Sequence, residues 1–162
     1  MTVSYDREIR TLRFMQGYGD DLLADIAPED FCRQPVAKMN HPAWIIGHLA
    51  VAADHHAAEA GGTPQLVGWD RRFDFGTEPS ADPADYPGKA ELIDAWHAAN
   101  DRYIAAVSTA APQALAEPTR GPLAEALPTV GDFLTFSLTA HTSLHLGQLS
   151  AWRRAAGMPR LF

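Results

Sequence analysis

Helical periodicity is the feature that most limits how this chain can fold. Four segments repeat apolar residues at helical spacing, and no segment sustains the alternation of apolar and polar residues that a half-buried β-strand shows. The four segments cover residues 4–26, 40–60, 89–110 and 129–156. Amphipathic helices of this length bury their apolar faces best against one another. The sequence therefore predicts an all-α fold, an antiparallel four-helix bundle.

Residues with known capping preferences mark the ends of these segments. Thr129 precedes Asp132 by three positions, which is a variant of the capping box at a helix start. Pro42 suits the first turn of a helix, because an N–H group at that position would have no partner. Gly61 and Gly157 follow the second and fourth segments, as glycine commonly does at helix ends.

A long connection joins the second and third predicted helices. Residues 61–88 are rich in Gly, Pro and Asp, and a connection of this length in a compact domain is usually functional or a crossover. It also contains Trp69, Phe73, Phe75 and Tyr86, which are too many aromatic residues for a solvated linker. We expect a packed crossover that covers one end or side of a single domain spanning residues 1–162.

Composition restricts the classes of partner. The chain has 13 Lys and Arg against 20 Asp and Glu, a formal net charge of −7, so its surface should repel nucleic-acid backbones. The N-terminal residues show no hydrophobic signal region, and the longest nearly apolar stretch, residues 42–53, is too short to span a bilayer. The single cysteine, Cys32, excludes an internal disulfide. These features predict a cytoplasmic protein that binds neither nucleic acid nor membrane.

Polar residues interrupt the expected core stripe of the last segment. The stripe is spaced 4, 3, 4, 3, 4 and consists of Leu134, Leu138, His141, His145, Gln148 and Trp152. A buried imidazole or amide without a partner costs roughly 1–3 kcal/mol, so three such residues in one stripe need a common explanation. His141 and His145 also form an i,i+4 pair, whose two rings project from one helix face and can bind one ion.

The second segment offers further imidazoles. His41, His48 and His55 lie seven positions apart, and His48 is in the middle of the apolar part of the helix. His41 lies at the helix start and suits a cap or a surface position equally well. His55 is better explained as a solvated residue and His97 as a boundary residue, and we expect His56 to take no part in metal binding.

Three histidines are the minimum ligand set of a zinc-like site, so His48, His141 and His145 together predict a metal centre. A buried, hydrogen-bonded polar network remains the alternative at this point. The residue after His141 is not the glutamate of the zincin peptidase motif, so no general-base carboxylate is built into this turn.

The same residues carry a family resemblance. Residues 40–49 and 141–149, which contain the spaced histidines, resemble the DinB/YfiT-like superfamily of four-helix-bundle metal proteins, and residues 153–159 look like the family's usual close to the last helix. The resemblance covers nearly the whole chain. It implies a DinB-like bundle that binds a divalent metal ion, nickel or zinc, through His48, His141 and His145.

The resemblance also implies a range of functions. Characterised relatives include transferases that use bacillithiol, mycothiol or glutathione, and members often form homodimers. We expect a homodimeric, metal-dependent thiol S-transferase acting on small electrophiles. A metal-dependent hydrolase and a non-catalytic metal-binding stress-response protein are the alternatives. Gln148, one turn after His145, is the candidate cofactor-binding residue. Arg153 and Arg154 are the nearest cationic groups, although charge at a helix C-terminus explains them more simply.

Overall fold

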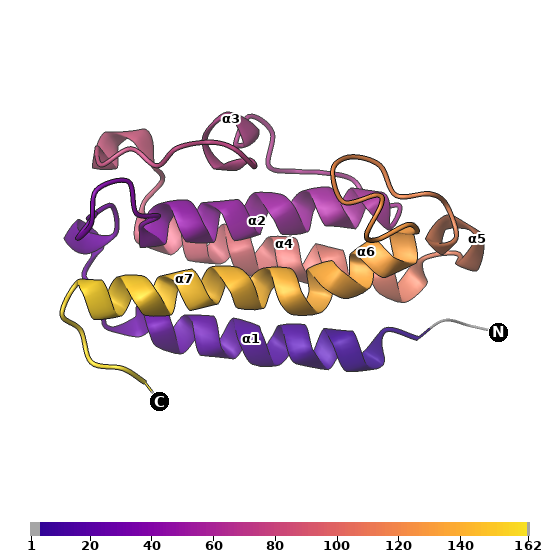
Figure 1. Ribbon diagram of the computed structural model, residues 1–162, viewed down its shortest axis with the longest axis horizontal. Coiled ribbons are helices and arrows are strands. Elements are labelled where there is room, and N and C mark those ends of the chain that lie inside the picture. The colour runs from indigo at the N-terminus through magenta and orange to yellow at the C-terminus, as the bar shows by residue number, and fades with distance from the viewer. Residues whose placement is uncertain (1–3, 162) are drawn as a thin grey trace.

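The computed structural model describes residues 4–161 and confirms the four-helix bundle (Figure 1). No β-strand occurs among these residues. The long elements are α1 (Asp6–Ala24), α2 (Pro42–Glu59), α4 (Lys89–Thr109) and a final helix made of α6 (Val130–Phe136), a π-turn (Ser137–His141) and α7 (Thr142–Ala155). The short elements are η1 (Pro28–Asp30), α3 (Asp70–Phe73), η2 (Pro83–Asp85) and α5 (Pro112–Leu115).

The helix directions differ from the expected antiparallel bundle. Asp54 of α2 is paired with Arg102 of α4, and a Cβ at Gly62, just past α2, would lie 3.4 Å from Ala106, so α2 and α4 run in parallel. The crossover causes this, because it returns the chain to the end of the bundle where α2 begins (Figure 1). The α6–α7 helix runs antiparallel to α2, since His48 lies beside His141 and His56 beside Ser137.

Side chains cap two helix starts, as predicted at Thr129 and as one of two alternatives at His41, which is buried and not a surface residue. The Nδ1 atom of His41 accepts a hydrogen bond from the Trp44 backbone N–H at 3.2 Å, so His41 is the N-cap of α2. Thr129 and Asp132 make both hydrogen bonds of a capping box at the start of α6. These side chains satisfy backbone N–H groups that have no partner within the helix.

The π-turn alters the expected core stripe of the last helix. A π-turn contains one more residue than an α-helical turn, so side chains after it are rotated relative to those before it. Leu138 is therefore followed in the core by Thr142, Leu146, Leu149 and Trp152. His141 and His145 are half-buried beside this stripe, and Gln148 is exposed. The expectation that these three polar residues form part of the core stripe is wrong for that reason.

The crossover packs against α2 with its aromatic residues, as expected, except at one position. Phe73 of α3 is buried, and Trp69 and Tyr86 pack against the same core cluster. Phe75, by contrast, is exposed. Figure 1 shows α3 lying over α2, and the backbone carbonyl of Phe73, at the end of α3, is hydrogen-bonded to His48 in the middle of α2.

A buried carboxylate anchors the start of the crossover. The side chain of Asp54 is only 2% exposed, and Arg102 donates to its Oδ1 at 2.7 Å. Its Oδ2 accepts from the backbone N–H groups of Gln65 and Leu66 at 2.7 and 2.8 Å. One side chain of α2 thus holds both α4 and the first residues of the crossover.

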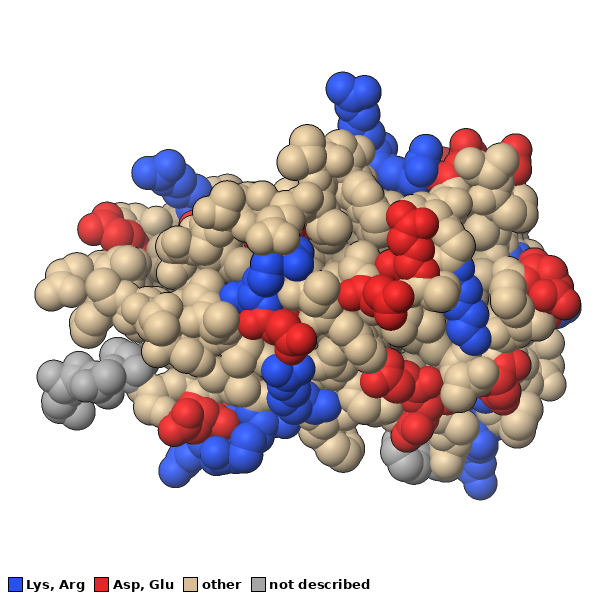
Figure 2. All heavy atoms as spheres, turned by 180° about the vertical axis from the view of Figure 1, so that it is seen from behind, with Lys and Arg blue, Asp and Glu red and all other residues tan. Residues whose placement is uncertain are grey.

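Acidic and basic side chains are interspersed on the face of the molecule drawn in Figure 2, with no continuous basic patch across it. None of the helices formed by residues 4–161 combines the length and the apolar character that crossing a membrane requires.

Candidate metal centre

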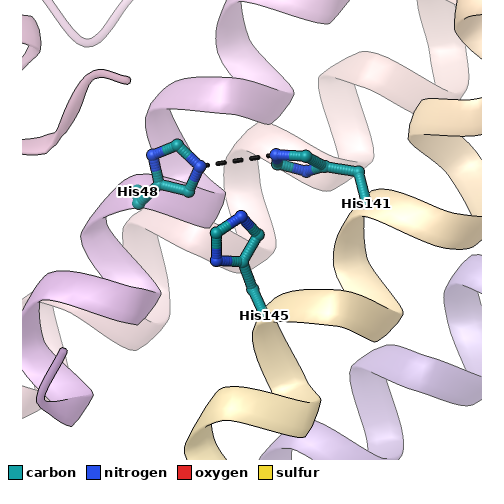
Figure 3. Close-up of side chains that lie close together, drawn as sticks. All are labelled: His48, His141 and His145. Atoms are coloured by element: carbon teal, nitrogen blue, oxygen red, sulfur yellow. Dashed lines mark hydrogen bonds between the residues drawn. The ribbon is translucent and has the colours of Figure 1, made fainter. Parts of the chain in front are cut away.

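The structure brings the three predicted histidines together. His48 projects from α2, and the rings of His141 and His145 project toward it from the last helix (Figure 3). One nitrogen atom of each ring lies within 4.8 Å of the corresponding atoms of the other two, an arrangement that can hold a metal ion. We refer to these three residues as the triad.

One pair within the triad already has the spacing of two ligands of one ion. The Nε2 atoms of His48 and His141 are 3.4 Å apart. Two nitrogens that each lie about 2.05 Å from one tetrahedral zinc ion are about 3.3 Å from each other. The ring of His145 lies close by, with its centroid 4.4 Å from that of His48 and 4.7 Å from that of His141.

The orientation of His48 is set by the crossover. Its Nδ1–H donates to the backbone carbonyl of Phe73 at 2.7 Å, so the lone pair on Nε2 is directed toward the triad. The indole ring of Trp44 stacks on the same imidazole, with centroids 4.9 Å apart and planes at 4°. A backbone carbonyl that accepts from the second ring nitrogen is the usual support of a histidine that binds a metal.

His145 lacks the kind of hydrogen bond that holds His48, although Gln148 lies beside it. The Nδ1 atom of His145 is buried and has no hydrogen bond of ordinary geometry. The Gln148 side chain lies near enough to favour the protonated form of this ring, and its Oε1 also accepts from the Asn40 amide at 3.1 Å. Gln148, the predicted cofactor-binding residue, is thus an exposed residue at the edge of the triad.

The triad is uncharged at neutral pH. Burial, and after it the neighbouring imidazoles, lower the pKa of His141 and of His145 to about 3. Burial also lowers the pKa of His48, and this effect outweighs its hydrogen bond to Phe73. Three neutral imidazoles therefore direct lone pairs toward one region, and this donor set suits zinc, nickel, copper and iron. The residues present fit a divalent ion.

His56 is a neighbour of the site that the sequence prediction missed. Its Nδ1 is hydrogen-bonded to the hydroxyl of Ser137 in the π-turn, and its ring meets that of His141 edge-on with centroids 5.5 Å apart. Burial, followed by the nearby His55 and His48, lowers its pKa to about 3. The available signal was that His48, Ala52 and His56 follow the i, i+4, i+8 spacing of one helix face, whereas the prediction followed a spacing of seven.

The remaining histidines lie outside the cluster. His41 bonds through Nε2 to the carbonyl of Ser80 at 2.8 Å. His55 faces Asp70 at 3.6 Å, and His97 faces Asp20 at 2.8 Å.

The two arginines after the triad are not equivalent. Arg153 is buried and donates to the carbonyl oxygens of Leu22 and Pro159 and to the carboxylate of Asp25. It therefore ties α7 to the end of α1 and is not available to a cofactor. Arg154 is exposed.

Comparison with known families agrees with this architecture. A family model described as the DinB superfamily matches residues 11–149. The chain belongs to the DinB superfamily. DinB-like proteins bind metals, and the triad gives this DinB protein three histidines placed where they can do so. No curated protein and no solved structure matches the chain.

Proposed function

We propose that this DinB protein is a thiol S-transferase that depends on a divalent metal ion, nickel or zinc, held by His48, His141 and His145. Its thiol substrate would be a low-molecular-weight compound such as bacillithiol, mycothiol or glutathione, and its second substrate a small electrophile. The reaction forms a sulfur–carbon bond and breaks a carbon–halogen bond or the carbon–oxygen bond of an epoxide. The halide or the epoxide oxygen takes the electron pair, and the thiol proton goes to solvent or to that oxygen.

The observation that carries the proposal is the composition of the cluster, which consists of three imidazoles and no carboxylate. Neutral ligands leave the full charge of a divalent ion in place, so the site favours a further anionic ligand. A divalent ion held there lowers the pKa of a bound thiol and keeps it ionised at neutral pH. Thiolate is the soft anion that suits zinc and nickel.

The surrounding residues support binding of this kind. The carbonyl of Phe73 fixes the tautomer of His48, and Gln148 lies beside His145. The indole of Trp44 covers one face of the His48 ring. These contacts limit the rotation of the rings, and restricted rotation lowers the entropy lost when three side chains bind one ion.

Metal analysis of the protein as isolated tests the ligand set. The changes His48→Ala, His141→Ala and His145→Ala should each lower the metal content sharply. His97→Ala is the matched control, because His97 is half-exposed and paired with Asp20. Equal metal content in all four variants would contradict the proposal. His56→Ala would not serve as a control, since the His56 ring contacts that of His141.

Spectroscopy of the cobalt- or nickel-substituted protein tests the chemistry. Addition of bacillithiol, mycothiol or glutathione should produce a sulfur-to-metal charge-transfer band with at least one of them, and His48→Ala should abolish it. If no thiol gives such a band, while His48→Ala removes an ester or amide hydrolysis, the protein is a metal-dependent hydrolase. If neither activity is present, the non-catalytic alternative takes its place.

A further inference from the structure

A small pocket lies beside the triad, with a volume of about 280 Å³. Its lining consists of Lys38, Met39, Asn40, Gln148 and Ala151. Gln148 places the pocket next to the triad, because it follows His145 by one helical turn of α7. The pocket is large enough for one end of a small molecule.

The hydrogen bond between the two amides in this pocket leaves donor groups free. The Oε1 atom of Gln148 accepts from the Asn40 side chain at 3.1 Å. The NH₂ group of Gln148 is therefore left for the pocket, together with the second N–H of the Asn40 amide. The Lys38 ammonium adds a charged donor to these two amide groups.

Lys38 occupies a backbone conformation that lysine rarely adopts. Its φ angle is +63°, and among residues 4–161 it is the only non-glycine residue with a positive φ. It lies in a turn that is closed by the Met39 N–H donating to the Val36 carbonyl at 3.1 Å. Glycine would form this turn without strain. What lysine adds at this position is its ammonium group.

The ammonium of Lys38 is open to a ligand. Its only charged partner among the described residues is Glu78, at 3.7 Å, and the two side chains are 83% and 80% exposed. An ion pair as exposed as this one contributes little and exchanges readily with other anions. A carboxylate in the pocket could bind the ammonium and the Gln148 amide together.

From this arrangement we propose that the pocket binds a carboxylate group of the thiol that reacts at the triad. The inference rests on the proposed function and adds the substrate class, which is thiols that carry an anionic group. Glutathione and bacillithiol carry carboxylates and mycothiol does not. The protein should therefore prefer the first two.

Binding of a blocked thiol to the full chain tests the pocket independently of metal chemistry. S-methylglutathione keeps both carboxylates but has no thiol, and its diethyl ester has neither carboxylates nor a thiol. In NMR spectra of the metal-free protein, S-methylglutathione should shift the side-chain NH₂ signals of Asn40 and Gln148, and the diethyl ester should not. Equal shifts with both compounds, or none with either, would overturn the inference.

Three variants test the role of the lysine. Lys38→Gly removes the ammonium and the strained backbone together. It should raise the melting temperature. It should also weaken S-methylglutathione binding about tenfold, which is the loss expected for a charge-assisted hydrogen bond. Lys38→Met should weaken binding to the same extent without the gain in stability. Glu78→Gln removes the competing carboxylate and should bind the ligand at least as tightly as the wild type. Undiminished binding by both Lys38 variants would overturn the inference.

Charge-transfer titrations of the cobalt protein separate failure of this inference from failure of the proposed function. If glutathione and its diethyl ester give the same band with the same affinity, the thiolate chemistry stands and the anionic pocket does not. If no thiol gives a band but S-methylglutathione still binds through Lys38, the pocket stands and the transferase proposal does not.

Discussion

Replacement of Gly47 by alanine tests whether packing of the crossover controls the triad. A Cβ atom at this position would lie no farther than 2.5 Å from three carbon atoms of the Phe73 ring. Phe73 is 1% exposed, and its carbonyl accepts the hydrogen bond from His48 at 2.7 Å. Ordinary contact begins near 3.4 Å. The Phe73 ring would therefore have to move by about 1 Å, and the carbonyl that orients His48 would move with it.

The expected magnitudes separate stability from metal affinity. Overpacking of a filled core costs about 1–3 kcal/mol, and exchange of glycine for alanine within a helix returns about 1 kcal/mol. Gly47→Ala should therefore lower the free energy of unfolding by about 0–2 kcal/mol. Loss of the hydrogen bond to His48 should weaken metal binding about 10–100-fold, as for other contacts that orient a metal-binding histidine.

Gly17→Ala in α1 is the matched control. Gly17 lies within a helix, and a Cβ there would meet no atom within 4 Å. This change should raise stability by about 1 kcal/mol and leave metal affinity unchanged. Urea unfolding measures the first quantity and competition with a chromogenic chelator the second. If Gly47→Ala binds metal as tightly as the wild type, the Phe73 carbonyl does not orient His48. If it gains stability as Gly17→Ala does, the described packing of Phe73 is wrong.

Three further outcomes are expected. The metal-free protein should lose stability as the pH falls below about 6.5. Burial lowers the pKa of the triad histidines and of His56 in the folded protein, so the unfolded chain binds more protons in this range. A free energy of unfolding in urea that is independent of pH would contradict this. Asp54→Ala should cost about 3 kcal/mol of unfolding free energy, since it leaves Arg102 without its buried partner, and a loss below about 1 kcal/mol would refute the anchoring role. Light scattering at micromolar concentration should give a dimer of the 17.6 kDa chain, because Phe14 and Leu144 are 69% and 60% exposed; a monomer mass would refute it.

Much of the fold followed from local sequence signals. The ends of the long helices depend on residues such as His41, Pro42 and Thr129, whose capping chemistry acts over three or four positions and is readable without tertiary structure. The parallel direction of α2 and α4 was not readable in this way. It depends on contacts such as Asp54 with Arg102, between residues that are far apart in the chain.

The candidate site was predicted in part. The pair His141 and His145 was visible because one helical turn separates them, and His48 because a polar residue stood in an apolar segment. The supporting contacts were not visible. The Phe73 carbonyl is a backbone group and has no sequence signature, and the contact between His56 and Ser137 depends on the π-turn. No composition or spacing rule for α-helices anticipates that extra residue.

The π-turn has the form of a one-residue insertion. It lets one helix direct leucines from both sides of the turn into the core, which a regular helix with this spacing could not do. Residues before it supply Leu134 and Leu138 to the core, and residues after it supply Leu146 and Leu149. Deletion of one residue between positions 137 and 141 would restore a continuous α-helix. It would rotate the residues after the deletion by about 100° relative to those before it. Either Leu134 and Leu138, or the later leucines together with the two histidines, would then face the wrong way. A homologue that lacks one residue between positions 137 and 141 should therefore also lack the metal site.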